Sequence, residues 1–71
     1  MPTPVKAHIA GTVWKVEVSV GDPVSEGQTV VILESMKMEM PVEAPSSGLV
    51  SRVVAVSGQA VEEGTLLLEL D

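Results

Sequence analysis

Apolar and polar residues alternate along several short segments of the chain. Valine occupies every second position of residues 15–20, and Met, Met and Val do the same in residues 38–43. A period of two is typical of a strand with one buried face. Three more segments rich in branched apolar residues are predicted strands: Thr29–Leu33, Leu49–Val56 and Thr65–Leu70. Glycine and proline separate these segments and leave no amphipathic helical stretch of ten residues, so the pattern predicts an all-β domain.

The chain repeats itself with an offset of 37 residues. When residues 4–34 are aligned with residues 41–71, 11 of the 31 pairs are identical. The identical pairs are mainly turn glycines and core-type valines: Pro4/Pro41, Val5/Val42, Ala7/Ala44, Gly11/Gly48, Val13/Val50, Val16/Val53, Gly21/Gly58, Val24/Val61, Glu26/Glu63, Gly27/Gly64 and Leu33/Leu70.

Neither half can bury its own apolar face. We therefore expect the two halves to pack about a pseudo-two-fold axis and to close a flattened barrel or sandwich. The repeat also predicts that Leu33 and Leu70 occupy equivalent buried positions.

The composition limits both the size and the partners of the protein. Seventy-one residues predict a single domain, residues 1–71, and 22 branched aliphatic residues exclude a disordered chain. Ten acidic and four basic side chains give a net charge of −6, which disfavours nucleic acid and anionic membranes as partners. No apolar run reaches transmembrane length and no signal sequence is evident, so the cytoplasm is the expected compartment.

Few side chains could support catalysis or metal binding. The chain has no cysteine and one histidine, His8, so we expect neither a disulfide nor a metal site. Nothing organises His8 into a hydrolase triad, and we predict no catalytic residue. Trp14 is the only aromatic residue, and we expect it to cover one edge of the core rather than to stack on a nucleic-acid base.

Residues 35–40, with the sequence Ser-Met-Lys-Met-Glu-Met, lie between the two repeats and form a predicted hairpin. Hairpin tips favour Asn-Gly, Asp-Gly or Gly-X, and this segment contains no Gly, Asn, Asp or Pro. Such a local exception is expected at a functional site. Lys37 lies at the midpoint of the chain between two thioether side chains, so we expect Met36 or Met38 to be accessible and Met40 to pack in the core.

The segment Glu34-Ser-Met-Lys-Met-Glu39 resembles the biotin attachment motif of the biotin/lipoyl carrier family, whose hallmark is Met-Lys-Met at a hairpin tip. The resemblance covers residues 5–70. It includes further segments: Gly11-Thr-Val-Trp-Lys-Val16, Gly21-Asp22…Val24…Gly27, Ala44-Pro45…Gly48 and Gly58…Val61-Glu-Glu-Gly64. Many members have alanine where this chain has Ser35, a small residue that also suits a turn.

The resemblance implies two four-stranded antiparallel sheets with the target lysine on an exposed turn. A biotin protein ligase would join biotin, through biotinyl-AMP, to the Lys37 amine as an amide. The carrier would then move between a biotin carboxylase and a carboxyltransferase, with an acyl-CoA as the expected acceptor, and would catalyse no step itself. Met36 and Met38 flank the attachment residue, and Glu34 and Glu39 either contribute to recognition by the ligase or keep the tip soluble.

Two other functions stay open at this point. The first is a lipoyl carrier of a dehydrogenase or glycine-cleavage system, which usually has Asp before the lysine and Ala or Val after it. The second is an unmodified interaction module that has kept the fold. The sequence is also compatible with a free-standing carrier and with one piece of a longer carboxylase chain.

Overall fold

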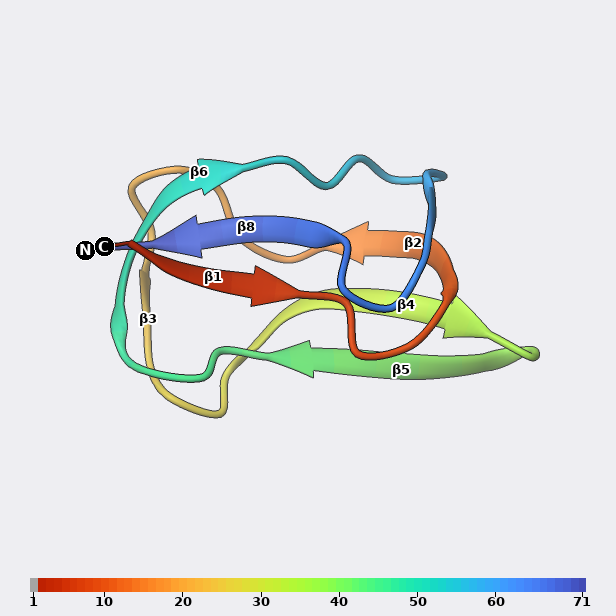
Figure 1. The fold of residues 1–71 in the computed structure, drawn as a ribbon. Coiled ribbons are helices and arrows are strands. Elements are labelled where there is room, and N and C mark those ends of the chain that lie inside the picture. Colours follow the sequence, from red (N-terminus) through yellow and green to blue (C-terminus); the bar gives the residue numbers. More distant parts are fainter. Residues whose placement is uncertain (1) are drawn as a thin grey trace.

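Eight short strands build the protein in a computed structural model that describes residues 2–71 (Figure 1). The strands are β1 (Thr3–Lys6), β2 (Gly11–Val16), β3 (Pro23–Val24), β4 (Thr29–Ser35), β5 (Met38–Glu43), β6 (Gly48–Val53), β7 (Ala60–Val61) and β8 (Leu66–Leu70). They form two four-stranded sheets with the strand orders β1-β8-β6-β3 and β5-β4-β2-β7, and every pairing is antiparallel. The predicted all-β fold of two four-stranded sheets is thus confirmed. Within residues 2–71 there is no helix that could cross a bilayer.

The two sheets are related by the repeat. Exchanging β1–β4 for β5–β8 converts the strand order of one sheet into that of the other. Equivalent hydrogen bonds recur 37 residues apart: the Ala7 N–H donates to the Thr65 carbonyl at 2.9 Å, and the Ala44 N–H to the Gln28 carbonyl at 2.8 Å. Each sheet contains two strands from each half of the chain, so neither half completes a sheet alone.

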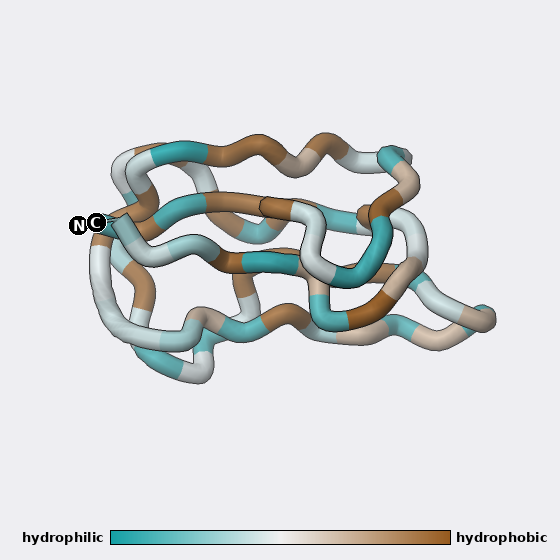
Figure 2. The backbone as a smooth tube through the Cα atoms, in the orientation of Figure 1, coloured by the Kyte–Doolittle hydropathy of each residue, from teal (hydrophilic) through white to brown (hydrophobic). Residues whose placement is uncertain are grey.

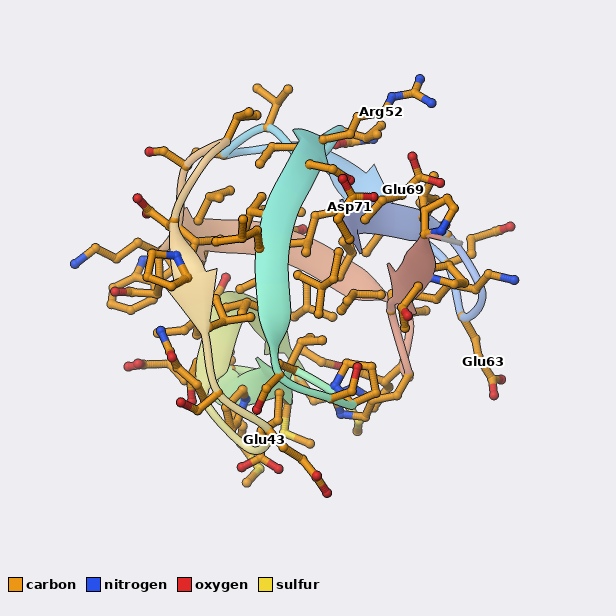
Figure 3. The ribbon with its side chains drawn as sticks, turned by 90° about the vertical axis from the view of Figure 1, so that its left-hand side faces the viewer. Glu43, Arg52, Glu63, Glu69 and Asp71 are labelled. Carbon is orange, nitrogen blue, oxygen red and sulfur yellow. The ribbon has the colours of Figure 1, made fainter. Side chains whose placement is uncertain are left out.

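Aliphatic side chains fill the space between the sheets. Figure 2 shows hydrophobic and hydrophilic stretches alternating along the strands, and Figure 3 shows Glu43, Arg52 and Glu63 pointing outward from the filled interior. No polar or charged residue among those described is buried. Leu33 is 0% exposed and Leu70 is 1% exposed, which confirms that these repeat-related residues occupy equivalent buried positions.

Two predicted strands are shorter than their apolar patterns suggested. The alternation in residues 15–20 does not continue as a strand, because β2 ends at Val16 and Val20 is exposed. A tight turn follows, in which the Asp22 carboxylate accepts a hydrogen bond from the Ser19 N–H at 2.9 Å. In the second half β6 likewise ends at Val53, where the Val54 and Ala55 N–H groups both donate to the Leu67 carbonyl.

A β-bulge displaces Trp14. Val13 pairs with Leu33 and Lys15 with Ile32, so Trp14 is the extra residue between two consecutive pairs. Its side chain is 51% exposed and therefore covers the core only in part. Bulges of this kind locally disrupt the ladder and redirect a side chain, a feature that period-two patterning does not reveal.

Gly11 and Gly48 allow two strands to approach the ends of their neighbours. A Cβ atom on Gly11 would lie 2.5 Å from the Glu34 carbonyl oxygen, and one on Gly48 would lie 2.5 Å from the Asp71 carbonyl oxygen. Both oxygens belong to the backbone, so the clash cannot be relieved by rotating a side chain. The close approach at Gly11 places the start of β2 against the segment that leads into the β4–β5 turn.

We expect Gly11→Ala and Gly48→Ala each to lower the free energy of unfolding by about 1–3 kcal/mol, the usual cost of overpacking. Urea denaturation of the two variants and the wild type measures the loss. The two sites are geometrically equivalent, so their losses should be similar. Wild-type stability in both variants would contradict the close backbone approach.

Candidate functional site

The β4–β5 hairpin ends in a two-residue turn formed by Met36 and Lys37. Ser35 pairs with Met38 and closes the turn. Met36 has a φ of 54° and Lys37 a φ of 65°, the only positive values at non-glycine residues in the described chain. Positive φ at both central residues is the feature of a type I′ turn, the connection whose twist matches that of an antiparallel hairpin.

This turn conformation is costly for the residues that adopt it. The left-handed region costs an L-residue with a β-carbon about 1–2 kcal/mol relative to the right-handed one. Asn-Gly would form the same turn with less strain. The tip therefore carries strain at two adjacent residues, a property associated with functional sites.

We expect Met36→Gly to raise the free energy of unfolding by about 0.5–1 kcal/mol, since glycine adopts positive φ without a steric penalty. The matched control is Met38→Gly, also an exposed methionine but within β5, where glycine should destabilise by about 0.5–1 kcal/mol. Thermal unfolding measures both variants. A lower melting temperature for Met36→Gly would contradict strain at the turn.

The base of the hairpin is anchored in the core. Leu33 of β4 pairs with Met40 of β5. Leu33 is fully buried and Met40 is partly buried against the core cluster, as expected from the sequence. In Figure 1 the tip projects at one end of the molecule, and the start of β1 and the end of β8 lie together at the opposite end. Thr3 pairs with Leu70 there, which ties both terminal strands into one sheet.

The side chains of the tip are open to solvent. Met36 is 90% exposed and Met38 is 63% exposed, so both methionines flanking the lysine are accessible. Lys37 is also exposed. The ion pairs within residues 2–71 join Lys15 to Glu17 at 3.7 Å and Arg52 to Glu69 at 3.8 Å, and neither includes Lys37. The structure thus presents a primary amine, free of carboxylate partners within residues 2–71, between two apolar side chains.

Glu34 and Glu39 lie directly opposite each other, next to the closing pair of the turn. Both are exposed. Like charges in opposed cross-strand positions are destabilising, so folding alone does not favour this pair. The sequence placed the two glutamates on either side of Lys37, but their juxtaposition depends on the two-residue length of the turn.

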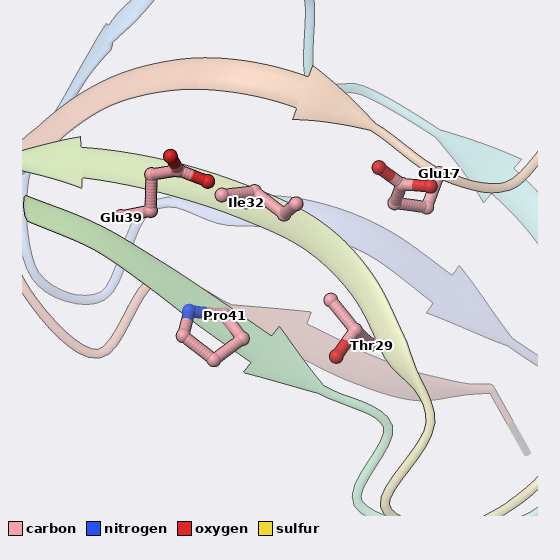
Figure 4. Close-up of a pocket in the computed structure, with 5 residues that line it drawn as sticks. All are labelled: Glu17, Thr29, Ile32, Glu39 and Pro41. Atoms are coloured by element: carbon pink, nitrogen blue, oxygen red, sulfur yellow. The ribbon is translucent and has the colours of Figure 1, made fainter.

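An open hollow of about 460 Å³ lies beside the hairpin and was not predicted from the sequence. Figure 4 shows its lining: Glu39 and Pro41 from β5, Thr29 and Ile32 from β4, and Glu17 just beyond β2. The hollow contains no histidine or lysine, and Lys37 is not part of its wall. It is a neighbouring surface feature rather than a binding pocket for the lysine.

The geometry at the tip suits a covalent attachment. The amine is accessible, the two-residue turn that carries it is closed by the Ser35–Met38 pair, and the buried Leu33 anchors the hairpin. Residues 2–71 contain no cluster of three potential metal-ligating side chains. His8 lies exposed in the connection between β1 and β2 and makes no hydrogen bond or ion pair with the tip.

Known proteins resemble this chain over nearly its whole length. The family described as "Biotin-requiring enzyme" matches residues 1–70. A "Biotin/lipoyl attachment protein" of Bacillus subtilis is 52% identical over 66 residues, which are 93% of this chain and 90% of that protein. A "Biotin-dependent acyl-coenzyme A carboxylase alpha3 subunit" of Mycobacterium leprae is 44% identical over 66 residues, 93% of this chain and 11% of that subunit.

Solved structures share the fold. The urea carboxylase of Kluyveromyces lactis superposes with a TM-score of 0.94 at 35% sequence identity, over 100% of this chain and 6% of that one. The chain therefore matches small proteins such as the Bacillus subtilis one almost end to end, and a small part of much longer carboxylases.

Proposed function

Because the chain belongs to the biotin/lipoyl attachment family, we propose that it is a biotin carboxyl carrier domain modified on Lys37. The observation that carries the proposal is the position of Lys37: its amine is exposed at the tip of a strained hairpin turn, between two accessible methionines. No other lysine is similarly placed, since Lys6 ends β1 and Lys15 lies within β2 beside Glu17.

The residues at the tip fit a covalently bound biotin. Lys37 offers a nucleophilic amine once it has lost a proton. Its attack on the carbonyl carbon of biotinyl-AMP forms an amide as the bond from that carbon to the phosphate oxygen breaks, and AMP leaves. Amide formation removes the lysine charge and changes the net charge of the chain from −6 to −7. Biotin, when bound, supplies a ureido nitrogen that carries a carboxyl group from one active site to the next. The strained turn holds the attachment point away from the sheets, so the fold does not cover it.

The carrier itself supplies position rather than catalysis. Strand β1 starts and strand β8 ends at the end of the molecule opposite the tip, and the longest dimension is 32 Å. A tether attached at the terminal end would leave the tip free to enter a partner's active site. Tethering makes each transfer effectively intramolecular and raises the local concentration of the transferred group.

The partners follow from this role. We propose a biotin protein ligase that loads Lys37, a biotin carboxylase that loads the carboxyl group, and a carboxyltransferase that removes it. An acyl-CoA is the acceptor we favour, supported by the similarity to an acyl-coenzyme A carboxylase subunit. The structural similarity to a urea carboxylase makes urea one competing acceptor. Glu34 and Glu39 form an opposed acidic pair that a ligase could recognise, and the repulsion between them supports a role beyond folding.

Co-expression with a biotin protein ligase in the presence of biotin tests the proposal. Intact mass spectrometry should show one biotinyl increment per chain. A lipoyl increment after parallel co-expression with a lipoyl ligase, without any biotinyl increment, would favour the alternative carrier function. That alternative is supported by the similarity to a protein named for both attachments. An unmodified chain in both experiments would favour an interaction module.

A further inference from the structure

The methionines of the hairpin differ sharply in their surroundings. Met36 is 90% exposed and Met38 is 63% exposed, whereas Met40 is partly buried and packs against the core. All three lie within five consecutive positions of the chain. Oxidation of a methionine thioether depends on access to its sulfur atom, so the tip should react before the base of the hairpin.

We propose that Met36 and Met38 form a reversible oxidation site that controls the loading of Lys37, an inference that rests on the proposed function. The oxidant is a peroxide. The Sδ lone pair attacks one peroxide oxygen, and the S–O bond forms as the O–O bond breaks. Sulfur is oxidised and the peroxide is reduced. With hydrogen peroxide, the departing hydroxide takes the proton from the attacked oxygen and leaves as water.

The product changes the surface that a ligase meets. A sulfoxide is polar and chiral where the thioether was apolar and flexible. Both methionines are neighbours of Lys37 in the chain and both are exposed, so we expect the surface that a ligase meets at Lys37 to include them. An apolar contact that must instead desolvate a sulfoxide weakens the complex.

The fold should tolerate this oxidation. Neither Met36 nor Met38 belongs to the buried core cluster, so a sulfoxide at either position disrupts no packing. Oxidation of Met40 would insert a polar group against the core and threaten folding. Oxidation of Met36 and Met38 should therefore weaken binding by the ligase without unfolding the domain. The exposed sulfoxides also remain accessible to methionine sulfoxide reductases, which makes the change reversible.

The test is oxidation of the unmodified domain with hydrogen peroxide, followed by removal of the peroxide with catalase before any ligase is added. Tandem mass spectrometry should show oxygen added to Met36 and Met38 earlier than to Met40, with Met1 scored separately. The kcat/KM of biotinylation should fall at least about fivefold, the equivalent of one lost interface contact. The melting temperature should stay within about 3 °C of the untreated domain.

Two controls attribute the effect to the tip. Treatment with the two sulfoxide reductases, one for each epimer, should restore the kcat/KM of the oxidised wild type. In a Met36→Leu/Met38→Leu variant, peroxide should leave the variant's own kcat/KM unchanged. A proportional loss in that variant would assign the effect to another residue and overturn the proposal.

Other outcomes also overturn it. The proposal fails if Met40 reacts as fast as Met36. It also fails if both tip methionines are fully oxidised and the kcat/KM of biotinylation is unchanged. If the untreated domain accepts no biotin, the proposed function fails and the regulatory role fails with it. The order in which the methionines oxidise is measured without the ligase, so that part of the proposal is tested even if the domain accepts no biotin.

Discussion

Replacing Leu33 or Leu70 by alanine is expected to lower the free energy of unfolding by about 2–5 kcal/mol. Both leucines are essentially inaccessible to solvent and lie at equivalent points of the repeat. A 71-residue domain has a total stability of about 4–11 kcal/mol, so either substitution removes a large part of it. Urea denaturation followed by circular dichroism measures the loss, and the midpoint of both variants should shift to a much lower urea concentration than that of the wild type.

Leu49→Ala is the matched control, because it makes the same chemical change at a leucine that is 53% exposed. It should alter stability by no more than about 1 kcal/mol, since little buried volume is lost. Equal losses for Leu33→Ala and Leu49→Ala would contradict the burial of Leu33 in the core. A loss at Leu33 far larger than at Leu70 would show that the two halves contribute unequally.

Replacing Lys37 by arginine is expected to abolish biotinylation while leaving the fold intact. The guanidinium group stays protonated and cannot act as the amine nucleophile. Arginine keeps the charge, and it has the same steric cost as lysine at positive φ, so the turn should not change. Intact mass after co-expression with the ligase measures loading, and thermal unfolding measures stability, which should change by no more than about 0.5 kcal/mol.

Lys15→Arg provides the control for this substitution. Lys15 lies in β2, forms an ion pair with Glu17 and is distant from the turn in the strand register. Its replacement should leave biotinylation at the wild-type level. Residual loading of Lys37→Arg would mean that a second amine accepts biotin, and a large loss of stability would mean that the tip supports the fold.

The parts of the fold that depend on apolar burial were predictable from the sequence. Turn glycines and core valines recur at one fixed offset, and burial of both apolar faces requires two packed sheets. The two-residue strands β3 and β7 were not predictable, because periodicity needs more residues than either strand contains. The early end of β2 is followed by a turn and the displacement of Trp14 arises from a bulge, and neither feature leaves a trace in a period-two pattern.

The attachment site was predictable in kind but not in detail. Ser35–Met40 stood out because it lacks the residues that hairpin tips prefer, and the structure shows that Met36 and Lys37 form the turn regardless, at positive φ. The opposition of Glu34 and Glu39 follows once the turn is known to contain two residues. The hollow beside the hairpin depends on side chains from three segments, so no local pattern reveals it.

Site mapping of the loaded wild-type domain tests the central claim most directly. The chain has three lysines, Lys6, Lys15 and Lys37, and tandem mass spectrometry of the biotinylated protein can assign the label to one of them. We predict biotin on Lys37 alone, with Lys6 and Lys15 unmodified. Biotin on either of those two lysines, with Lys37 free, would contradict the assignment of the hairpin tip as the attachment site.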